Sequence, residues 1–121
     1  MKKSYAMKWV AALRSGKYKQ GKGRLHKLDA SNHHKYCCLG VLCDVVGAPK
    51  ERVGSVFYYG GRAGVLPNVV VDLVGMHSVE GTLGDTSLTY LNDIYLNDGE
   101  VGPRKNFSQI ADIIEKNWRK L

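Results

Sequence analysis

Residues 36–44, with the sequence Tyr-Cys-Cys-Leu-Gly-Val-Leu-Cys-Asp, constrain the fold more than any other part of the chain. Three cysteines stand among aliphatic residues there, and the one charge is at the last position. The pattern predicts a helix over residues 39–46 that ends at Gly47, with Pro49 just beyond it. Because this helix is apolar all round, we expect it to be buried nearly all round. If Cys37 and Cys38 continue this helix, then at about 100° per residue they and Cys43 point in three directions and cannot converge on one metal ion.

The cysteine count also indicates the surroundings in which the protein works. Three is an odd number, so a complete set of disulfides within one chain is impossible. Reduced, buried thiols fit a cytoplasmic protein. The neighbouring His33 and His34 lack the spacing of a zinc site, and we predict no metal and no cofactor. A nucleophile pair of Cys37 and His34 is the alternative, but no third residue is visible that would orient the base.

Length and local patterns predict the fold class. A chain of 121 residues can bury one core, so we expect a single domain over residues 1–121. No apolar run approaches the roughly 20 residues that cross a bilayer, and we predict no membrane contact. The expected architecture is α+β: a compact domain with three to five helices packed on a small antiparallel sheet.

In the first third of the chain, the patterns predict a helix and a hairpin. The helix is capped by Ser4, runs to about Ser15 and stops at Gly16. Its apolar stripe would consist of Met7, Val10, Ala11 and Leu13 or Arg14. Residues 24–28 alternate weakly, as an edge strand does, and a turn over residues 29–32 leads into a returning strand over residues 33–37.

Further elements are predicted downstream. Residues 56–59 form a strand that Gly60 and Gly61 end. Pro67 opens a helix at its first position. Residues 79–85 form a loop or a short hairpin, and residues 87–95 form a helix. Asn106 and Gln109 resemble a capping box at the start of the last helix.

Charge placement is the second strong feature. Residues 1–27 contain nine Lys and Arg and no Asp or Glu, so the whole excess of +7 comes from this quarter of the chain. Such a stretch can bind nucleic acid phosphates, although no helix-turn-helix, RNP or zinc-finger pattern accompanies it. A solvated basic surface is the alternative.

Two glycine-rich turns combine features that bind a nucleotide. Residues 21–24, Gly-Lys-Gly-Arg, let backbone N–H groups approach a phosphate whose charge Arg24 would neutralise. Residues 58–62, Tyr-Tyr-Gly-Gly-Arg, place Tyr58 to stack on a base and Arg62 to meet a phosphate. In both places a solvated turn or a strand end is the alternative. The sequence lacks Gly-x-Ser-x-Gly, His-Glu-x-x-His and Gly-x-Gly-x-x-Gly, and we predict no catalytic residues.

Five stretches resemble a family of small accessory proteins of tailed bacteriophages and prophages, most of them described as hypothetical. They are residues 9–21, 36–44, 64–67, 91–93 and 107–115, of which the first two are specific. Residues 94–104, which repeat Tyr-Leu-Asn-Asp, depart from the family pattern. The resemblance implies a phage context, and small phage accessory proteins often counter host defence, in some cases by sequestering a nucleotide immune signal without catalysis.

The function we expect is therefore binding of a small anionic, nucleotide-like ligand, such as a cyclic ADP-ribose derivative or a cyclic dinucleotide, by a phage protein in the host cytoplasm. The predicted ligand-binding residues are Arg24, His26, His34, Tyr36, Tyr58, Arg62 and Asn92. The alternative is a module that binds nucleic acid or inhibits a host protein through residues 1–27. A homodimer is compatible with either function, and a nucleotide-cleaving enzyme is the least supported class.

Overall fold

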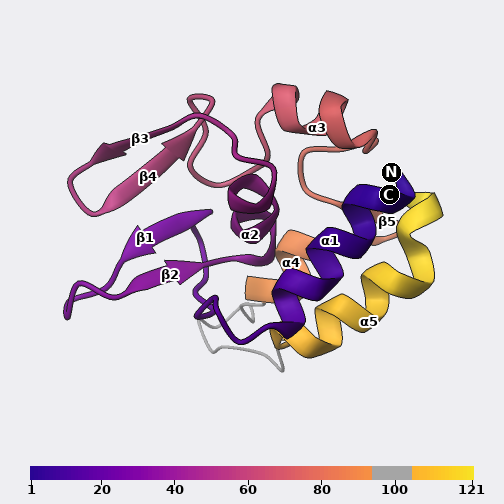
Figure 1. Ribbon diagram of the computed structural model, residues 1–121, viewed down its shortest axis with the longest axis horizontal. Coiled ribbons are helices and arrows are strands. Elements are labelled where there is room, and N and C mark those ends of the chain that lie inside the picture. The colour runs from indigo at the N-terminus through magenta and orange to yellow at the C-terminus, as the bar shows by residue number, and fades with distance from the viewer. Residues whose placement is uncertain (94–104) are drawn as a thin grey trace.

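The computed structural model describes residues 1–93 and 105–121 and has the predicted α+β architecture (Figure 1). The helices are α1 (Lys3–Arg14), α2 (Cys38–Val45), α3 (Asn68–Val74), α4 (Leu88–Asp93) and α5 (Phe107–Asn117), followed by the 3-10 turn η1 (Trp118–Lys120). The larger sheet contains β1 (His26–Leu28), β2 (His34–Tyr36), β3 (Lys50–Val53) and β4 (Val56–Tyr59), and the smaller contains β5 (Thr82–Leu83) and β6 (Thr86–Ser87). The second Tyr-Leu-Asn-Asp copy lies outside the described residues.

The larger sheet is antiparallel, with the strand order β2-β1-β4-β3. The predicted hairpin of β1 and β2 is confirmed, with His26 opposite Tyr36. The prediction of an edge strand for β1 is wrong, because β4 pairs with its other side at Lys27 and Val56. β3 was not predicted: all four of its residues are exposed, and its pairing with β4 rather than a burial pattern makes it a strand.

The first helix buries a different stripe from the predicted one. The predicted cap at Ser4 is wrong, because α1 begins at Lys3 and Lys2 is its N-cap residue. The buried residues of α1 are Ala6, Trp9, Val10 and Leu13. Relative to the predicted orientation, the helix is rotated about its axis so that Trp9 faces the core. The indole Nε1–H of Trp9 donates to the carbonyl oxygen of Cys38 at 2.8 Å. This buried hydrogen bond joins α1 to α2 and leaves Ala11 exposed.

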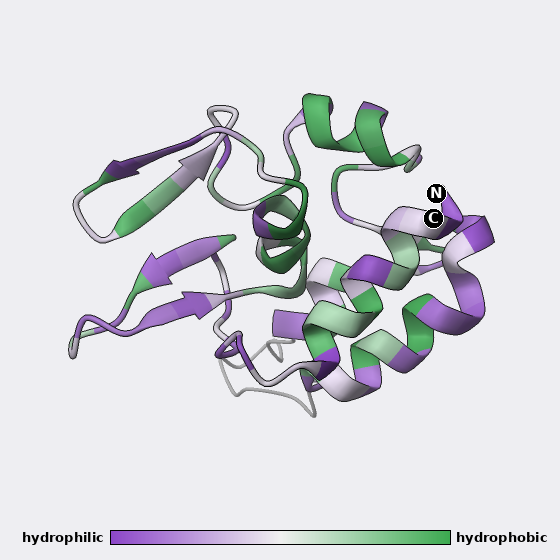
Figure 2. Cartoon of the chain, viewed as in Figure 1, coloured by the Kyte–Doolittle hydropathy of each residue, from purple (hydrophilic) through white to green (hydrophobic). Residues whose placement is uncertain are grey.

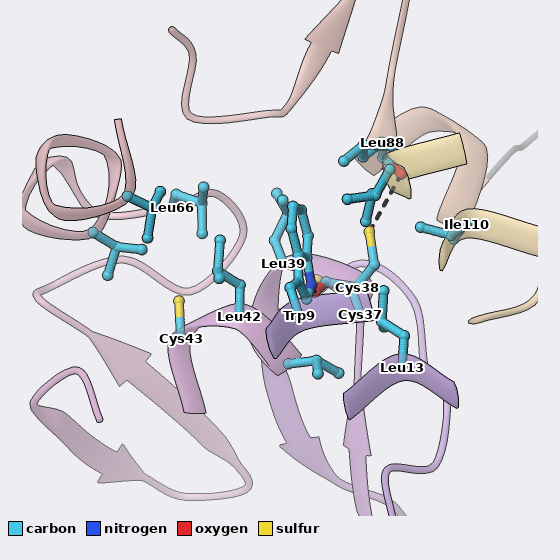
Figure 3. Packing of buried hydrophobic residues seen from close by; sticks show 14 of the residues in the cluster. Trp9, Leu13, Cys37, Cys38, Leu39, Leu42, Cys43, Leu66, Leu88 and Ile110 are labelled. Atoms are coloured by element: carbon cyan, nitrogen blue, oxygen red, sulfur yellow. Dashed lines mark hydrogen bonds between the residues drawn. The ribbon is translucent and has the colours of Figure 1, made fainter. Parts of the chain in front are cut away.

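The cysteine-rich helix α2 lies at the centre of the molecule, between the larger sheet and the pair α1 and α5 (Figure 1). Its first six residues are buried, as predicted, and Figure 2 shows it as a strongly hydrophobic element. The three cysteines are free and buried. Figure 3 shows Cys38 and Cys43 in different parts of the core, with the Cys38 thiol directed at the carbonyl oxygen of Leu88, 3.6 Å away.

Gly40 lets α2 approach the chain that enters β1. A Cβ atom at this position would lie 1.6 Å from the carbonyl oxygen of Leu25. The same carbonyl accepts a hydrogen bond from the backbone N–H of Cys37 at 3.2 Å. Close packing, rather than a special backbone conformation, therefore explains the glycine in this motif.

The remaining elements follow the predictions closely. α3 ends at Gly75, whose φ of 73° is left-handed, but Pro67 is its N-cap residue rather than its first residue. β5 and β6 form the predicted short hairpin. The capping box of α5 is confirmed, because the side chains of Asn106 and Gln109 each accept the other's backbone N–H. Within the described ranges, none of the helices is both long and apolar enough to span a bilayer.

Candidate functional site

An open hollow beside the β1–β2 hairpin is the candidate site. It has a volume of about 380 Å³ and is lined by Lys17, Lys19, Asn32, His33, His34 and Lys35. We call it the basic hollow. Two backbone hydrogen bonds hold its halves together: Tyr36 donates to the carbonyl of Lys19 at 2.9 Å, and Gly21 donates to the carbonyl of Tyr36 at 2.7 Å. The chain that follows α1 is thereby fixed alongside β2.

The side chains around the basic hollow make it electropositive. Three of its lining residues are lysines, and no Asp or Glu of the described part of the chain is among them. Asp29 lies in the adjoining hairpin turn, where its Oδ1 accepts the backbone N–H groups of His33 and Ser31, each at 2.9 Å. The backbone hydrogen bond from His33 is the main cause that lowers the pKa of Asp29. This carboxylate shapes the turn, and its Oδ2 lies 3.8 Å from Nδ1 of the lining residue His33.

A buried histidine lies directly behind the basic hollow. Nε2 of His26 is 2.7 Å from Nδ1 of His34, and Nδ1 of His26 is 2.9 Å from the hydroxyl of Tyr59. The ring of His26 is stacked between Phe57, at a centroid distance of 3.8 Å, and Tyr36, at 4.0 Å. His26 is therefore a fixed internal group, and His34 is the member of the pair that reaches the surface.

Burial controls the protonation of this cluster. It lowers the pKa of His26 to about 4, and repulsion from His34 and Lys50 contributes, while Asp44 opposes the shift. Burial also raises the pKa of Tyr36 to about 12 and raises the pKa of Tyr59. Near pH 7 these three residues are thus uncharged hydrogen-bonding groups.

Comparison with known proteins places the chain in a family. A family model described as a domain of unknown function, DUF8296, matches residues 1–118. The chain belongs to this family. No curated protein and no solved structure matches it. For this DUF8296 protein, a functional assignment therefore depends on the geometry of the site.

The residues predicted to bind a ligand are divided among several places in the DUF8296 structure. His34 lines the basic hollow, and His26 and Tyr36 lie behind it. Arg24 is exposed at the entry to β1 but does not line the hollow.

The predicted tyrosine–arginine site is not assembled as expected. Tyr58, Gly60 and Gly61 line a separate depression of about 280 Å³, together with Pro49, Lys50 and Glu51. Glu51 brings a negative charge there, and Arg62 is exposed but is not among these lining residues. The backbone of Arg62 bonds to that of Tyr59 and closes the turn after β4.

Asn92 lies inside the protein. Its Oδ1 accepts hydrogen bonds from the backbone of Cys38 at 3.2 Å and from Nε2 of Gln20 at 2.9 Å. Its Nδ2 donates to the carbonyl of Gly21 at 2.9 Å and to Oδ1 of Asp93 at 2.7 Å. Asn92 thus ties α4 to α2 and to the chain beside the hollow, and we omit it from the proposed site.

Five residues that line the basic hollow were not predicted from the sequence. The basic run and the hairpin could be recognised in the sequence, but their side chains at the hollow could not: Lys17, Lys19, Asn32, His33 and Lys35. The missing information was the bridge between Gln20 and Tyr36, which brings the two segments together. Among the residues that the structure describes, no three His, Cys, Asp or Glu side chains are grouped so that they could hold a metal ion.

Proposed function

We propose that this DUF8296 protein binds a small phosphate-bearing anion, with nucleotide-like character, in the basic hollow and releases it unchanged. The observation that carries the proposal is the convergence of Lys17, Lys19 and Lys35 without a lining carboxylate among the described residues. The hollow, at about 380 Å³, is also within the range of roughly 300–1,000 Å³ typical of small-molecule sites.

The imidazoles support a nucleotide rather than a simple ion. His33 and His34 provide planar faces and ring N–H groups beside the three ammonium groups. A base can stack on such a face while the lysines neutralise the phosphate. The resemblance to phage accessory proteins supports the finer proposal that the ligand is a nucleotide immune signal, which the protein sequesters.

The protonation states support binding without catalysis. Burial raises the pKa of Cys37 and Cys43 to about 12, so neither thiol is an available nucleophile near pH 7. His26, with its pKa lowered to about 4, is a poor base. None of these groups has a pKa near the working pH, where acid–base catalysts are most effective.

Nucleic acid binding through residues 1–27 is the second candidate. It is favoured by the basic N-terminal quarter, but that quarter does not act as one surface. Nη2 of Arg14 lies 2.6 Å from Asp112 and its Nη1 lies 3.0 Å from Glu115, both on α5. These carboxylates offset part of the positive charge of α1, whereas the lysines of the basic hollow have no such lining partner among the described residues.

Calorimetric titration with ADP, as a probe that carries a base and a diphosphate, tests the proposal. Lys35→Ala should weaken ADP binding by about three- to tenfold, because an exposed charge-assisted contact contributes on the order of 1 kcal/mol. Lys116→Ala on α5 is the matched control and should leave the affinity unchanged. Equal losses in both variants would show that only overall charge matters.

A salt series separates the two candidates. A protein that contacts six or more DNA phosphates loses about 10³-fold or more in affinity between 50 and 200 mM salt, because counterions are released. A small anion has no condensed counterion layer, so ADP binding should fall by less than about tenfold. Tight duplex or single-strand binding at physiological salt would favour the second candidate. Mass spectrometry of material released by denaturing protein from infected cells would identify the natural ligand.

A further inference from the structure

A line of hydrogen bonds runs from the interior to the basic hollow. It begins at the hydroxyl of Tyr59, passes through both ring nitrogens of His26 and ends at Nδ1 of His34. His34 lines the hollow, whereas Tyr59 and His26 have no exposed surface. The direction of the protons along this line decides what His34 offers to a ligand.

The buried hydroxyl fixes the first step. In the described part of the chain, His26 is the hydrogen-bond partner of the Tyr59 hydroxyl, and no second partner is found. If this hydroxyl accepted a proton from His26, its own buried proton would have no acceptor among the described residues, at a cost of about 1–3 kcal/mol. Tyr59 therefore donates to Nδ1 of His26.

The remaining steps follow from the chemistry of a neutral imidazole, which has one donor and one acceptor nitrogen. Because Nδ1 of His26 accepts, its proton is on Nε2 and is donated to Nδ1 of His34. Nδ1 of His34 must then accept, so neutral His34 carries its proton on Nε2, the nitrogen on the far side of the ring from His26. A hydrogen bond to one ring nitrogen in this way sets the tautomer of a histidine.

We propose that Tyr59 and His26 are positioning residues that fix the tautomer of His34, so that His34 presents an Nε2–H donor to the anion in the basic hollow. The donation from His34 to an anion rests on the proposed function, whereas the order of the hydrogen bonds from Tyr59 to His34 does not. The stack of Phe57 and Tyr36 on the two faces of His26 prevents its ring from tilting out of line. The donor is thus oriented before a ligand arrives, which lowers the entropy cost of binding.

The charged groups around His26 are compatible with this order. Lys50 and Asp44 face the cluster and lie 3.9 Å from each other. The Asp44 carboxylate also accepts the hydroxyl proton of Tyr18 at 2.5 Å. The Asp44 charge is therefore shared between Tyr18 and Lys50, and within the described part of the chain no hydrogen bond joins it to His26 or His34.

The first experiment reads the tautomers directly. Two-bond ¹H–¹⁵N correlation spectra of the labelled free protein at pH 7.5 distinguish Nδ1–H from Nε2–H imidazoles. We expect His26 and His34 each as a single Nε2–H tautomer, with an Nε2 proton on His26 that exchanges slowly with water. His77, which is exposed, should show fast proton exchange and serves as the reference. An Nδ1–H tautomer at His26 would overturn the proposal.

The second experiment tests the consequence for binding. In the double variant His26→Phe with Tyr59→Phe, apolar rings replace both ends of a buried hydrogen bond, a change that is often tolerated. His34 is then held neither in one tautomer nor in one ring orientation, and ADP affinity should fall by about three- to tenfold while the circular dichroism spectrum stays native. Unchanged ADP affinity in a folded double variant would refute the positioning role. If the native protein showed the expected tautomers but did not bind ADP, the proposed function and the donation from His34 to an anion would both be refuted. The order of the hydrogen bonds from Tyr59 to His34 would still hold.

Discussion

Gly40→Ala is the sharpest test of how the core is built. The added Cβ atom would lie 1.6 Å from the carbonyl oxygen of Leu25. Carbon and oxygen atoms in favourable contact are about 3.3–3.6 Å apart, so the backbones of α2 and of the segment before β1 would have to separate by almost 2 Å. Neither partner is a flexible side chain, so the strain cannot be relieved by rotation of a rotamer.

The expected loss of stability is the difference between two opposing effects. Overpacking of a core typically costs about 1–3 kcal/mol, and separating the backbones would also weaken the buried bonds of the Cys37 N–H and the Trp9 indole, each worth on the order of 1 kcal/mol. The higher helix propensity of alanine offsets roughly 1 kcal/mol of this loss. We expect a net decrease of about 2–4 kcal/mol in the free energy of unfolding, a large share of a typical total of about 5–15 kcal/mol.

Urea unfolding followed by tryptophan fluorescence measures this change, because Trp9 is fully buried. With an m-value of about 1.5 kcal/mol/M, the midpoint should fall by roughly 1.3–2.7 M. Gly64→Ala is the matched control, since a Cβ there meets nothing closer than the carbonyl oxygen of Gly23 at 4.0 Å. If the urea midpoint of Gly40→Ala lay within about 0.5 M of the midpoint of the control, close packing would not explain why residue 40 is a glycine.

Three further predictions follow from burial and capping. Because the folded state resists protonation of His26 from its ordinary pKa of 6.5 down to about 4, stability should fall by about 1–3 kcal/mol as the pH drops through this range. Urea midpoints against pH would measure this fall; an equal slope in the double variant His26→Phe with Tyr59→Phe would contradict it. Thiol reagents should label no cysteine rapidly in the native protein and all three after unfolding, and fast native labelling would show that the thiols are accessible. Asn106→Ala should lower stability by about 1 kcal/mol through loss of the capping box, whereas the exposed Ser108→Ala should change it little; equal midpoints would argue against the cap.

The parts of the fold that the sequence predicted are those set by local patterns. The buried helix α2, the β1–β2 hairpin and the capping box of α5 each depend on residues a few positions apart. The central place of β1 was missed because it depends on pairing with β4, more than 20 residues further along the chain. β3 forms a local hairpin with β4 and was missed because its four exposed residues show no burial pattern. The stripe of α1 was misplaced because a tertiary hydrogen bond from Trp9 to Cys38 sets its rotation.

The candidate site shows the same division between local and long-range information. His34 was predicted from its residue type, but the lysines that surround it were not, since the bridge from Gln20 to Tyr36 is invisible in the sequence. Asn92 was predicted to bind a ligand, but its side chain is fully buried. Three of its four hydrogen bonds are to Gln20, Gly21 and Cys38, which are more than 50 residues away in the chain and cannot be inferred from a local pattern; the fourth is to the adjacent Asp93.

The core motif and the candidate site are coupled through two adjacent residues. Leu25 is held from both sides, since its N–H donates to Ala63 at 2.6 Å and its carbonyl accepts from Cys37 and packs on Gly40. The next residue is His26, the middle of the hydrogen-bond line to the basic hollow. Any displacement of Leu25 must therefore move His26 relative to Tyr59. In the fraction of Gly40→Ala that stays folded, the His26 and His34 ring signals should shift, whereas those of the distant His77 should not. Gly40, which does not line the basic hollow, would then be required for the geometry of the site.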